Sequence, residues 1–231
     1  MPGLHRVATT NYDRAVTSLQ REIDGAIAAH RVLEAELQSL TDAQIGQPSC
    51  LPGWTRGHVI THIARNADSH RRILLAAESG RVVDQYVDGP TGRSDDIEAG
   101  SARTADQLRH DVLTSNALLE QAWGMASETG WAGHGVAVTS ADLPCNELPF
   151  WRWREATVHH ADLGLDYTWH DWPAAYVRNE LPRLVMLWAS RQPMGMTVLP
   201  ALALAVPEVH RVAWLLGRAD IDGLEPSTIF G

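Results

Sequence analysis

The 231-residue sequence contains no lysine, and all 19 of its basic residues are arginines. This absence excludes Schiff-base chemistry, pyridoxal-phosphate catalysis and a Walker A nucleotide loop, because each of these needs a lysine amine. Arginine is left to bind anions, and its planar guanidinium can hold a carboxylate through two parallel hydrogen bonds. We therefore expect arginine to hold any anionic substrate.

Cysteine is scarce, with only Cys50 and Cys145, which are too few for a disulfide framework and form no metal-type Cys-x-x-Cys pair. The amino-terminal segment has no apolar region typical of a signal peptide, and no apolar run approaches the length of a membrane span. The net charge of −9 disfavours general binding to nucleic acid. We expect a cytoplasmic protein with no membrane or nucleic-acid partner.

The apolar residues recur with the period of amphipathic helices. This pattern predicts a helix over about residues 11–40, a second helix from the N-cap Thr55 to about residue 79, and a third helix from Ser94 or Asp95 to about residue 126. A fourth helix is expected over about residues 146–163, with Gly164 as its C-cap. The glycine-rich connection before it predicts a hairpin or another extended excursion. Four helices joined in this way are typical of a four-helix bundle.

The pattern of apolar and polar residues changes after "WHDWP", at residues 169–173. A helix over residues 174–190 and another over about 208–216 flank the apolar, proline-interrupted segment "MGMTVLPALALAVP". We interpret this tail as a small α/β appendage. The expected fold is mainly α, with a helical bundle over residues 1–168 and a small carboxy-terminal α/β domain over residues 169–231.

The fourth predicted helix carries ionisable side chains among tryptophans, in the segment "FWRWREATVHH". Glu155 and His159 are four residues apart, so both side chains project from one face of the helix and can reach one metal ion. A surface Glu/His pair has the same spacing. The flanking aromatics indicate burial, however, and a buried charge needs a partner or a metal. His160 lies about 100° further round the helix and cannot easily share the ion.

The second predicted helix offers His58 and His62, again four residues apart. A ligand from a facing helix is how bundles build metal sites, and two histidines with one glutamate leave a fourth tetrahedral position open, as in catalytic zinc sites. Periodicity alone does not decide which histidine points inward. We favour His62, because it lies one turn deeper, and expect a structural or supporting role for His58. The ligand set also suits nickel, cobalt or iron.

Two motifs at this separation, "LPGWTRGHVITHIARNAD" and "RWREATVHHADLG", resemble the DinB-like metal-dependent bundles and specifically the mycothiol-dependent maleylpyruvate isomerases. The resemblance covers about residues 10–165 and extends thinly to "WLLGRADIDG". It implies that His62, Glu155 and His159 bind zinc and that mycothiol is the thiol cofactor. It also implies that Arg218 is catalytic, and it aligns a second arginine with Arg93, in the loop that opens the third helix.

The resemblance further implies an enzyme of aromatic-compound degradation that isomerises maleylpyruvate, or a related cis-enoyl diacid, to fumarylpyruvate. Addition of the thiolate, rotation about the resulting single bond and elimination of the thiol would achieve this. We assign Arg218 to stabilising the enolate charge and Arg93 to holding a substrate carboxylate. The partners would be a small anionic substrate and a low-molecular-weight thiol. The alternatives are a mycothiol S-transferase of the same fold and a non-catalytic metal- or ligand-binding module.

Overall fold

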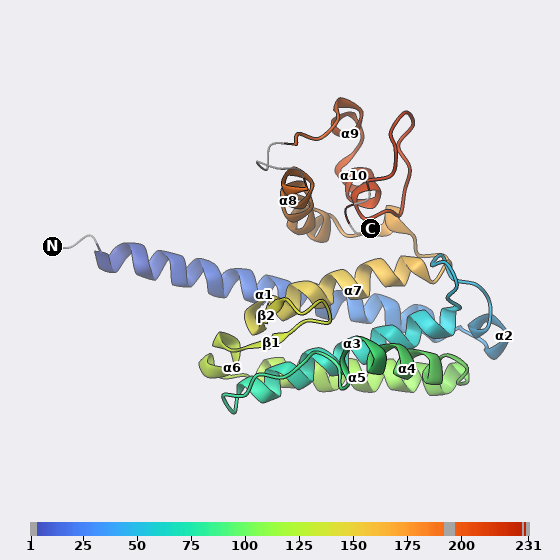
Figure 1. Ribbon diagram of the computed structural model, residues 1–231, viewed down its shortest axis with the longest axis horizontal. Coiled ribbons are helices and arrows are strands. Elements are labelled where there is room, and N and C mark those ends of the chain that lie inside the picture. Colours follow the sequence, from blue (N-terminus) through green and yellow to red (C-terminus); the bar gives the residue numbers. More distant parts are fainter. Residues whose placement is uncertain (1–3, 192–196, 228, 230–231) are drawn as a thin grey trace. The chain divides into compact units, whose positions relative to one another are not determined.

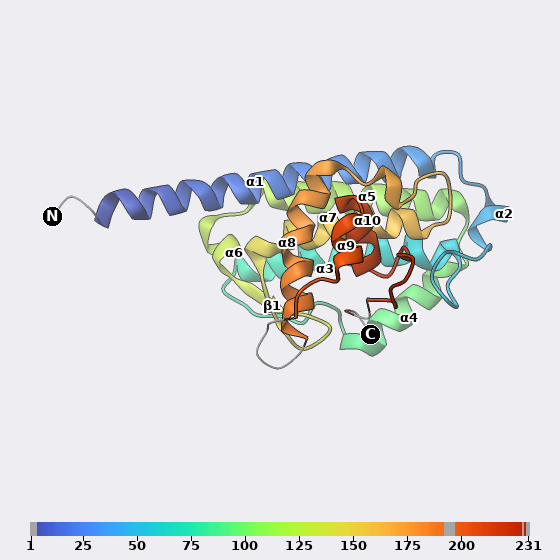
Figure 2. The ribbon, with the colours of Figure 1, turned by 90° about the horizontal axis from the view of Figure 1, so that it is seen from above.

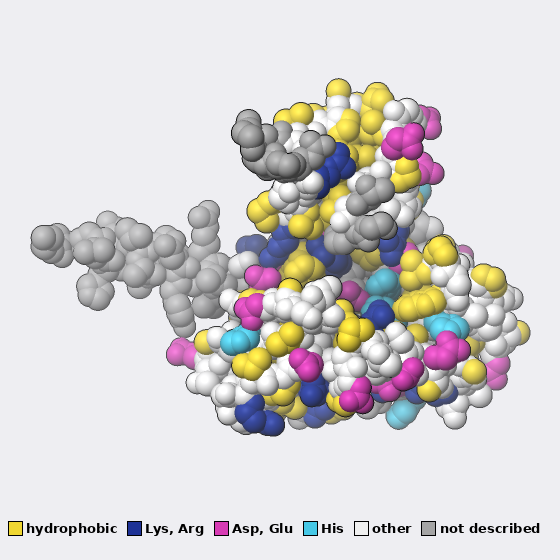
Figure 3. Space-filling model, in the orientation of Figure 1, with side chains coloured by type: hydrophobic (Ala, Val, Ile, Leu, Met, Phe, Trp, Pro, Cys, Tyr) yellow, Lys and Arg dark blue, Asp and Glu magenta, His cyan; other side chains and the backbone are white. Residues whose placement is uncertain are grey.

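The computed structural model describes residues 4–191, 197–227 and 229, with side chains described from residue 18 onward. The chain divides into two compact units, Met1–Gly164 and Leu165–Gly231. The regular structure is almost entirely helical, so the predicted mainly α fold is confirmed. Among the described residues, no helix combines the length and the apolar character that a bilayer crossing requires. Figure 3 shows acidic side chains scattered over the visible face of the first unit.

Four helices form a bundle in the first unit, and Figure 1 shows them as its main body. They are α1 (Leu4–Leu37), α3 (Arg56–Ala77), α5 (Ala105–Met125) and α7 (Leu148–Asp162). Helix α1 packs against α5 and α7, and α3 packs against the same two helices. Helices α3 and α7 are therefore neighbours, and these two carry the predicted metal ligands.

The predicted third helix is in fact two helices, α4 (Gly89–Ser101) and α5. The break occurs because Thr104 caps α5, where its side chain accepts a hydrogen bond from the backbone N–H of Gln107. The first of these helices, α4, also begins earlier than the predicted Ser94 or Asp95. Asp88 takes a left-handed conformation with φ of 59° just before α4 begins, so Ser94 lies inside this helix instead of capping it.

Shorter elements complete the first unit: α2 (Asp42–Ile45), α6 (Glu128–Ala132), the 3-10 turn η1 (Cys145–Glu147), β1 (His134–Val136) and β2 (Asp142–Pro144). The two strands pair antiparallel, which is the hairpin that the glycine-rich connection predicts. Gly135 lies so close to α3 that an added Cβ would stand 2.8 Å from the side chain of Ile73. The hairpin therefore covers the later part of α3.

The second unit contains η2 (Trp169–Asp171), α8 (Ala174–Ser190), α9 (Ala201–Ala205) and α10 (Glu208–Leu215), the last packing against α8 (Figure 2). The described part of this unit forms helices and turns, with no strand, and so differs from the α/β domain that the sequence suggested. Pro200 and Pro207 immediately precede α9 and α10. The segment between them is rich in alanine and leucine, which favour helix over strand.

A single buried side chain connects all four helices of the bundle. Arg152 on α7 has no exposed surface. Its Nε donates to His30 Nε2 on α1 at 2.9 Å, and its Nη2 donates to Asn116 Oδ1 on α5 at 2.7 Å. Its Nη1 donates to two acceptors on α3, the carbonyl oxygen of Ile63 and Asn66 Oδ1, each at 2.9 Å. These bonds fix how the helices are aligned along one another.

The bond from Arg152 also determines the state of His30. Because Arg152 Nε can only donate, His30 Nε2 must accept, and the imidazole proton lies on Nδ1. That nitrogen lies 2.8 Å from Glu120 Oε1 and donates to it. Burial lowers the pKa of His30 to about 4 despite the bond to Glu120, so the ring is neutral at pH 7. A neutral imidazole thus links a buried cation to a carboxylate at the edge of the core.

We expect the change Arg152→Met to lower the free energy of unfolding by about 3–5 kcal/mol, the range for breaking a buried ionic network. The substitution keeps an elongated side chain but leaves His30, Asn66 and Asn116 without their donor. Urea unfolding followed by circular dichroism would measure the loss. The same change at the exposed Arg81 should stay within about 0.5 kcal/mol. Equal effects of the two changes would show that the network is not a principal tie of the bundle.

Candidate metal centre

The start of α3 separates the two histidines that the sequence left as rivals. His58 belongs to the helix cap: its backbone N–H donates to Thr55 Oγ1, and its Nδ1 lies 2.7 Å from the same oxygen. Its Nε2 faces Glu98 Oε2 on α4 at 3.1 Å. His62 lies one turn deeper, with 4% of its surface exposed. The cap therefore occupies His58 and leaves His62 as the histidine that faces α7.

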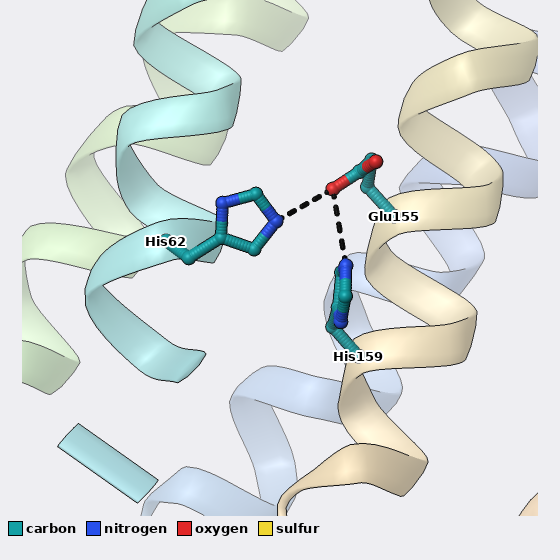
Figure 4. A group of neighbouring side chains, drawn as sticks. All are labelled: His62, Glu155 and His159. Carbon is teal, nitrogen blue, oxygen red and sulfur yellow. Dashed lines mark hydrogen bonds and ion pairs between the residues drawn. The ribbon is translucent and has the colours of Figure 1, made fainter. Parts of the chain in front are cut away.

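His62, Glu155 and His159 come together between α3 and α7, as Figure 4 shows. His62 Nε2 lies 2.8 Å from Glu155 Oε2, and His159 Nε2 lies 3.4 Å from the same oxygen. One ligand atom from each residue lies within 4.8 Å of those of the other two. His160 points elsewhere, since its Nε2 contacts Glu36 Oε2 on α1 at 2.5 Å.

The charges in this cluster suit metal binding. Burial lowers the pKa of His62 to about 4, although the hydrogen bond that its ring shares with Glu155 acts in the opposite direction. Burial alone would raise the pKa of Glu155, but the hydrogen bond with His62 and the proximity of His159 hold it well below its ordinary value. At pH 7 an ionised carboxylate therefore lies beside a neutral imidazole. These are the protonation states in which both groups bind a cation.

A second carboxylate lies behind His159, and the sequence reading missed it. Asp162 is buried, and its Oδ2 lies 2.8 Å from His159 Nδ1. Metal-binding histidines typically donate their other ring N–H to such a carboxylate, which fixes the tautomer and aims the free nitrogen at the ion. With Nδ1 donating to Asp162, the lone pair of Nε2 points into the cluster. The spacing His-x-x-Asp on one helix face was the signal in the sequence.

Arg93 reaches the cluster from α4. The sequence placed it in a loop before the third helix, whereas it lies inside a helix that packs on α3. Its Nη2 lies 3.2 Å from His62 Nδ1. Its guanidinium lies 5.9 Å from the ring centre of Trp54 and 5.8 Å from that of Tyr86. Two aromatic rings thus hold a cation beside the predicted ligands.

The cluster opens into a pocket of about 430 Å³, bounded by α3, α4, α7 and the β1–β2 hairpin. Neither cysteine lines it. Cys50 is exposed elsewhere, and Cys145 is fully buried, with burial raising the pKa of its thiol to about 11. A protonated, buried thiol is a poor nucleophile. The pocket therefore has no nucleophilic thiol of its own.

Arg218 belongs to the second unit, directly after α10 and Gly217, whose φ is 71°. Its backbone N–H donates to the carbonyl oxygen of Ala213 at 2.7 Å, and its Nη1 donates to that of Leu216 at 2.7 Å. These bonds hold the side chain close to the end of the helix. The prediction that Arg218 is a catalytic residue rests on the family resemblance.

Residues 26–164 match the family model described as the mycothiol maleylpyruvate isomerase N-terminal domain. The chain belongs to the mycothiol maleylpyruvate isomerase family. A crystal structure of the mycothiol-dependent maleylpyruvate isomerase is 27% identical, with a TM-score of 0.75 and coverage of 87% of this chain and 90% of that chain. A crystal structure of a histidine-to-alanine mutant of that isomerase is 26% identical, with the same TM-score and coverage. No curated protein matches the chain.

These matches confirm the predicted family and the prediction that the chain is an enzyme. The matched residues 26–164 include every residue of the cluster, Asp162 and Arg93. The likeness to the solved isomerase covers more of the chain than the family model does.

The donors of the cluster fit a divalent cation. Two imidazole nitrogens and one carboxylate oxygen match a zinc site that keeps a further position open, and Asp162 supplies the supporting carboxylate. The same ligands would also accept nickel, cobalt or iron.

We expect the purified protein to hold about one divalent ion per chain, and His62→Ala to lose nearly all of it. His58→Ala is the matched control, because it removes a histidine from the same helix that lies at the cap. Elemental analysis of the two variants would compare them directly. Equal metal content in both would show that His62 is not a ligand.

Proposed function

We propose that this enzyme is a zinc- and mycothiol-dependent isomerase that converts maleylpyruvate, or a related cis-enoyl diacid, to fumarylpyruvate. The observation that carries the proposal is the cluster of His62, Glu155 and His159 at the wall of a pocket that also contains Arg93. The relatives named above act with mycothiol, and one solved structure resembles the chain over 87% of its length.

The reaction needs a nucleophile that adds to the double bond and leaves again. Zinc held by the cluster would bind an external thiol as its thiolate, which is the nucleophilic form. Addition forms a C–S bond and moves the electron pair of the double bond onto the conjugated carbonyl, giving an enolate. Rotation about the new single bond and collapse of the enolate then break the C–S bond and return the thiolate. The lack of a cysteine in the pocket supports a thiol from outside.

Arg93 would hold a substrate carboxylate, and its contact with His62 suggests how it becomes available. In the structure its guanidinium N–H faces His62 Nδ1, which can accept only while the ring proton lies on Nε2. An imidazole that binds a cation through Nε2 carries its proton on Nδ1 and cannot accept from Arg93. Metal binding would therefore release the guanidinium for a carboxylate in the pocket.

Arg218 would stabilise the charge that develops on the enolate oxygen. A fixed guanidinium can donate two hydrogen bonds to such an oxygen, and donors of this kind give large rate effects. The hydrogen bonds that the backbone N–H and the Nη1 of Arg218 donate to the carbonyl oxygens of Ala213 and Leu216 support a fixed position.

We expect substrate to disappear with no net loss of free mycothiol, since an isomerase returns its thiol in each turnover. Thiol titration in parallel with the ultraviolet absorbance of the substrate would measure both. A thiol loss equal to the substrate consumed would instead identify an S-transferase that uses the same cluster.

The control is a variant that lacks both protein thiols, Cys50→Ser with Cys145→Ala. It should keep its activity and its dependence on added thiol. A variant that folds, retains metal and is inactive would show that a protein cysteine takes part.

We expect the two arginines to affect different kinetic constants. Arg218→Ala should lower kcat and kcat/KM together by about 10²- to 10³-fold, because the lost interaction forms only as charge develops. Arg93→Ala should act mainly by raising KM, because a carboxylate clamp contacts substrate and transition state alike. Both should keep the zinc content of the wild type. The change Arg81→Ala, at an exposed site, serves as the control.

The conservative change Arg218→Lys separates two roles of this residue, since it keeps the charge but loses the two-pronged geometry. Full activity of the lysine variant would mean that only positive potential is needed. Full activity of the alanine variant would remove Arg218 from the mechanism.

A further inference from the structure

The pocket continues along α3 and α7 beyond the metal ligands, toward the hairpin. On α3, Asn66 lies one turn after His62. On α7, Arg152 lies one turn before Glu155. Asn66 and Arg152 are hydrogen-bonded to each other, as are His62 and Glu155. The two helices therefore run antiparallel. His70, one further turn along α3, and Trp151 on α7 lie on the same side of the cluster, and both line the pocket.

The hairpin and its turn border this inner end with mostly apolar side chains, together with Thr139 and Asp142. The pocket-lining residues that it and its turn contribute include Ala137, Val138, Ala141 and Leu143. Gly135 of β1 anchors the hairpin on α3 at Ile73, less than one turn beyond His70.

Two buried nitrogen atoms at this end have no hydrogen-bond partner in the described part of the chain: His70 Nδ1 and Trp151 Nε1. His70 has only 1% of its surface exposed. Buried polar atoms in folded proteins are almost always paired, and leaving one unpaired is destabilising. Because both residues line the pocket, an oxygen of a bound ligand can satisfy them.

The inner end has no positive charge, because the charged residues that line it are the carboxylates Asp142 and Glu147. Burial, and secondly the nearby Arg152, lower the pKa of His70 to about 3, so its ring is neutral. The indole of Trp151 is always neutral and can only donate. Of the arginines whose side chains the structure describes, only Arg93 lines the pocket, and it lies at the other end, beside His62. A carboxylate would therefore bind at the Arg93 end, and an uncharged acceptor would suit the inner end.

We propose that His70 and Trp151 form a neutral subsite that binds a ketone oxygen of the substrate, so that the enzyme selects keto acids over acids without the ketone. A ketone only accepts hydrogen bonds, which matches two N–H donors, whereas a hydroxyl would bring a proton that needs an acceptor of its own. The proposal rests on the proposed function in one respect, that Arg93 holds the carboxylate.

The test compares the affinities of the zinc-loaded protein for pentanoate, 2-oxopentanoate and 4-oxopentanoate. Each acid is titrated without thiol, and binding is followed by NMR. The wild type should bind at least one keto acid roughly 3- to 10-fold more tightly than pentanoate, the effect of one neutral hydrogen bond. Trp151→Phe keeps the ring and removes only the N–H, and His70→Leu removes the imidazole. Both should lose most of this preference while keeping their zinc and their affinity for pentanoate.

The matched control is His110→Leu, which removes an exposed histidine from α5 and should keep the preference. If the acids bind and the preference is absent in the wild type or unchanged in both variants, the neutral subsite is wrong and the proposed function is untouched. If no acid binds, or Arg93→Ala leaves the binding of pentanoate unchanged, the anion site fails, and both proposals fail with it.

Discussion

The guanidinium of Arg152 is held by acceptors from three other helices, and the geometry of the cluster depends on that arrangement. On α3, its acceptors are the carbonyl oxygen immediately after His62 and the amide of Asn66. On α7, it lies three residues before Glu155. The spacing and alignment of α3 and α7 near Arg152 also set the distance between His62 and Glu155. A shift of either helix along its axis would therefore separate these two ligands.

The same core contains opposite charges that depend on one another. Burial lowers the pKa of Arg152 to about 10, and the strongest opposing influence is the Glu155 carboxylate. Glu155 in turn remains ionised through its hydrogen bond with His62. Buried charges without partners are strongly destabilising, so each group needs the others in place. These interactions run from Glu155 through Arg152 to His30 and Glu120. A divalent ion would add positive charge beside Glu155. At the opposite end, the neutral ring of His30 separates Arg152 from Glu120.

The sequence predicted much of this arrangement, because the signals are local. Helix periodicity and the cap at Thr55 placed α3, and α7 ends at the cap Leu163, one residue before the predicted Gly164, which is left-handed. The four-residue spacing placed Glu155 and His159 on one face. The choice of His62 over His58 followed from depth within the helix. The cap contact of His58 gives the physical reason.

What the sequence did not predict depends on contacts between distant segments. Arg152 resembles any arginine of a helix until its acceptors on α1, α3 and α5 are known. The role of His70 appears only when the hairpin covers the pocket. The break between α4 and α5 was missed because one threonine cap decides it, and the second unit was misjudged because its apolar segment forms a short helix between prolines.

The central claim is that His62, Glu155 and His159 hold a metal with a position open to an external thiol. Replacing the bound ion with Co²⁺ gives a direct test, because cobalt reports its ligands through its absorption spectrum. The account predicts visible bands of a four- or five-coordinate site, and a new near-ultraviolet sulfur-to-cobalt charge-transfer band when mycothiol is added. The band should be absent in His62→Ala. A cobalt site whose spectrum does not change with thiol would contradict the account.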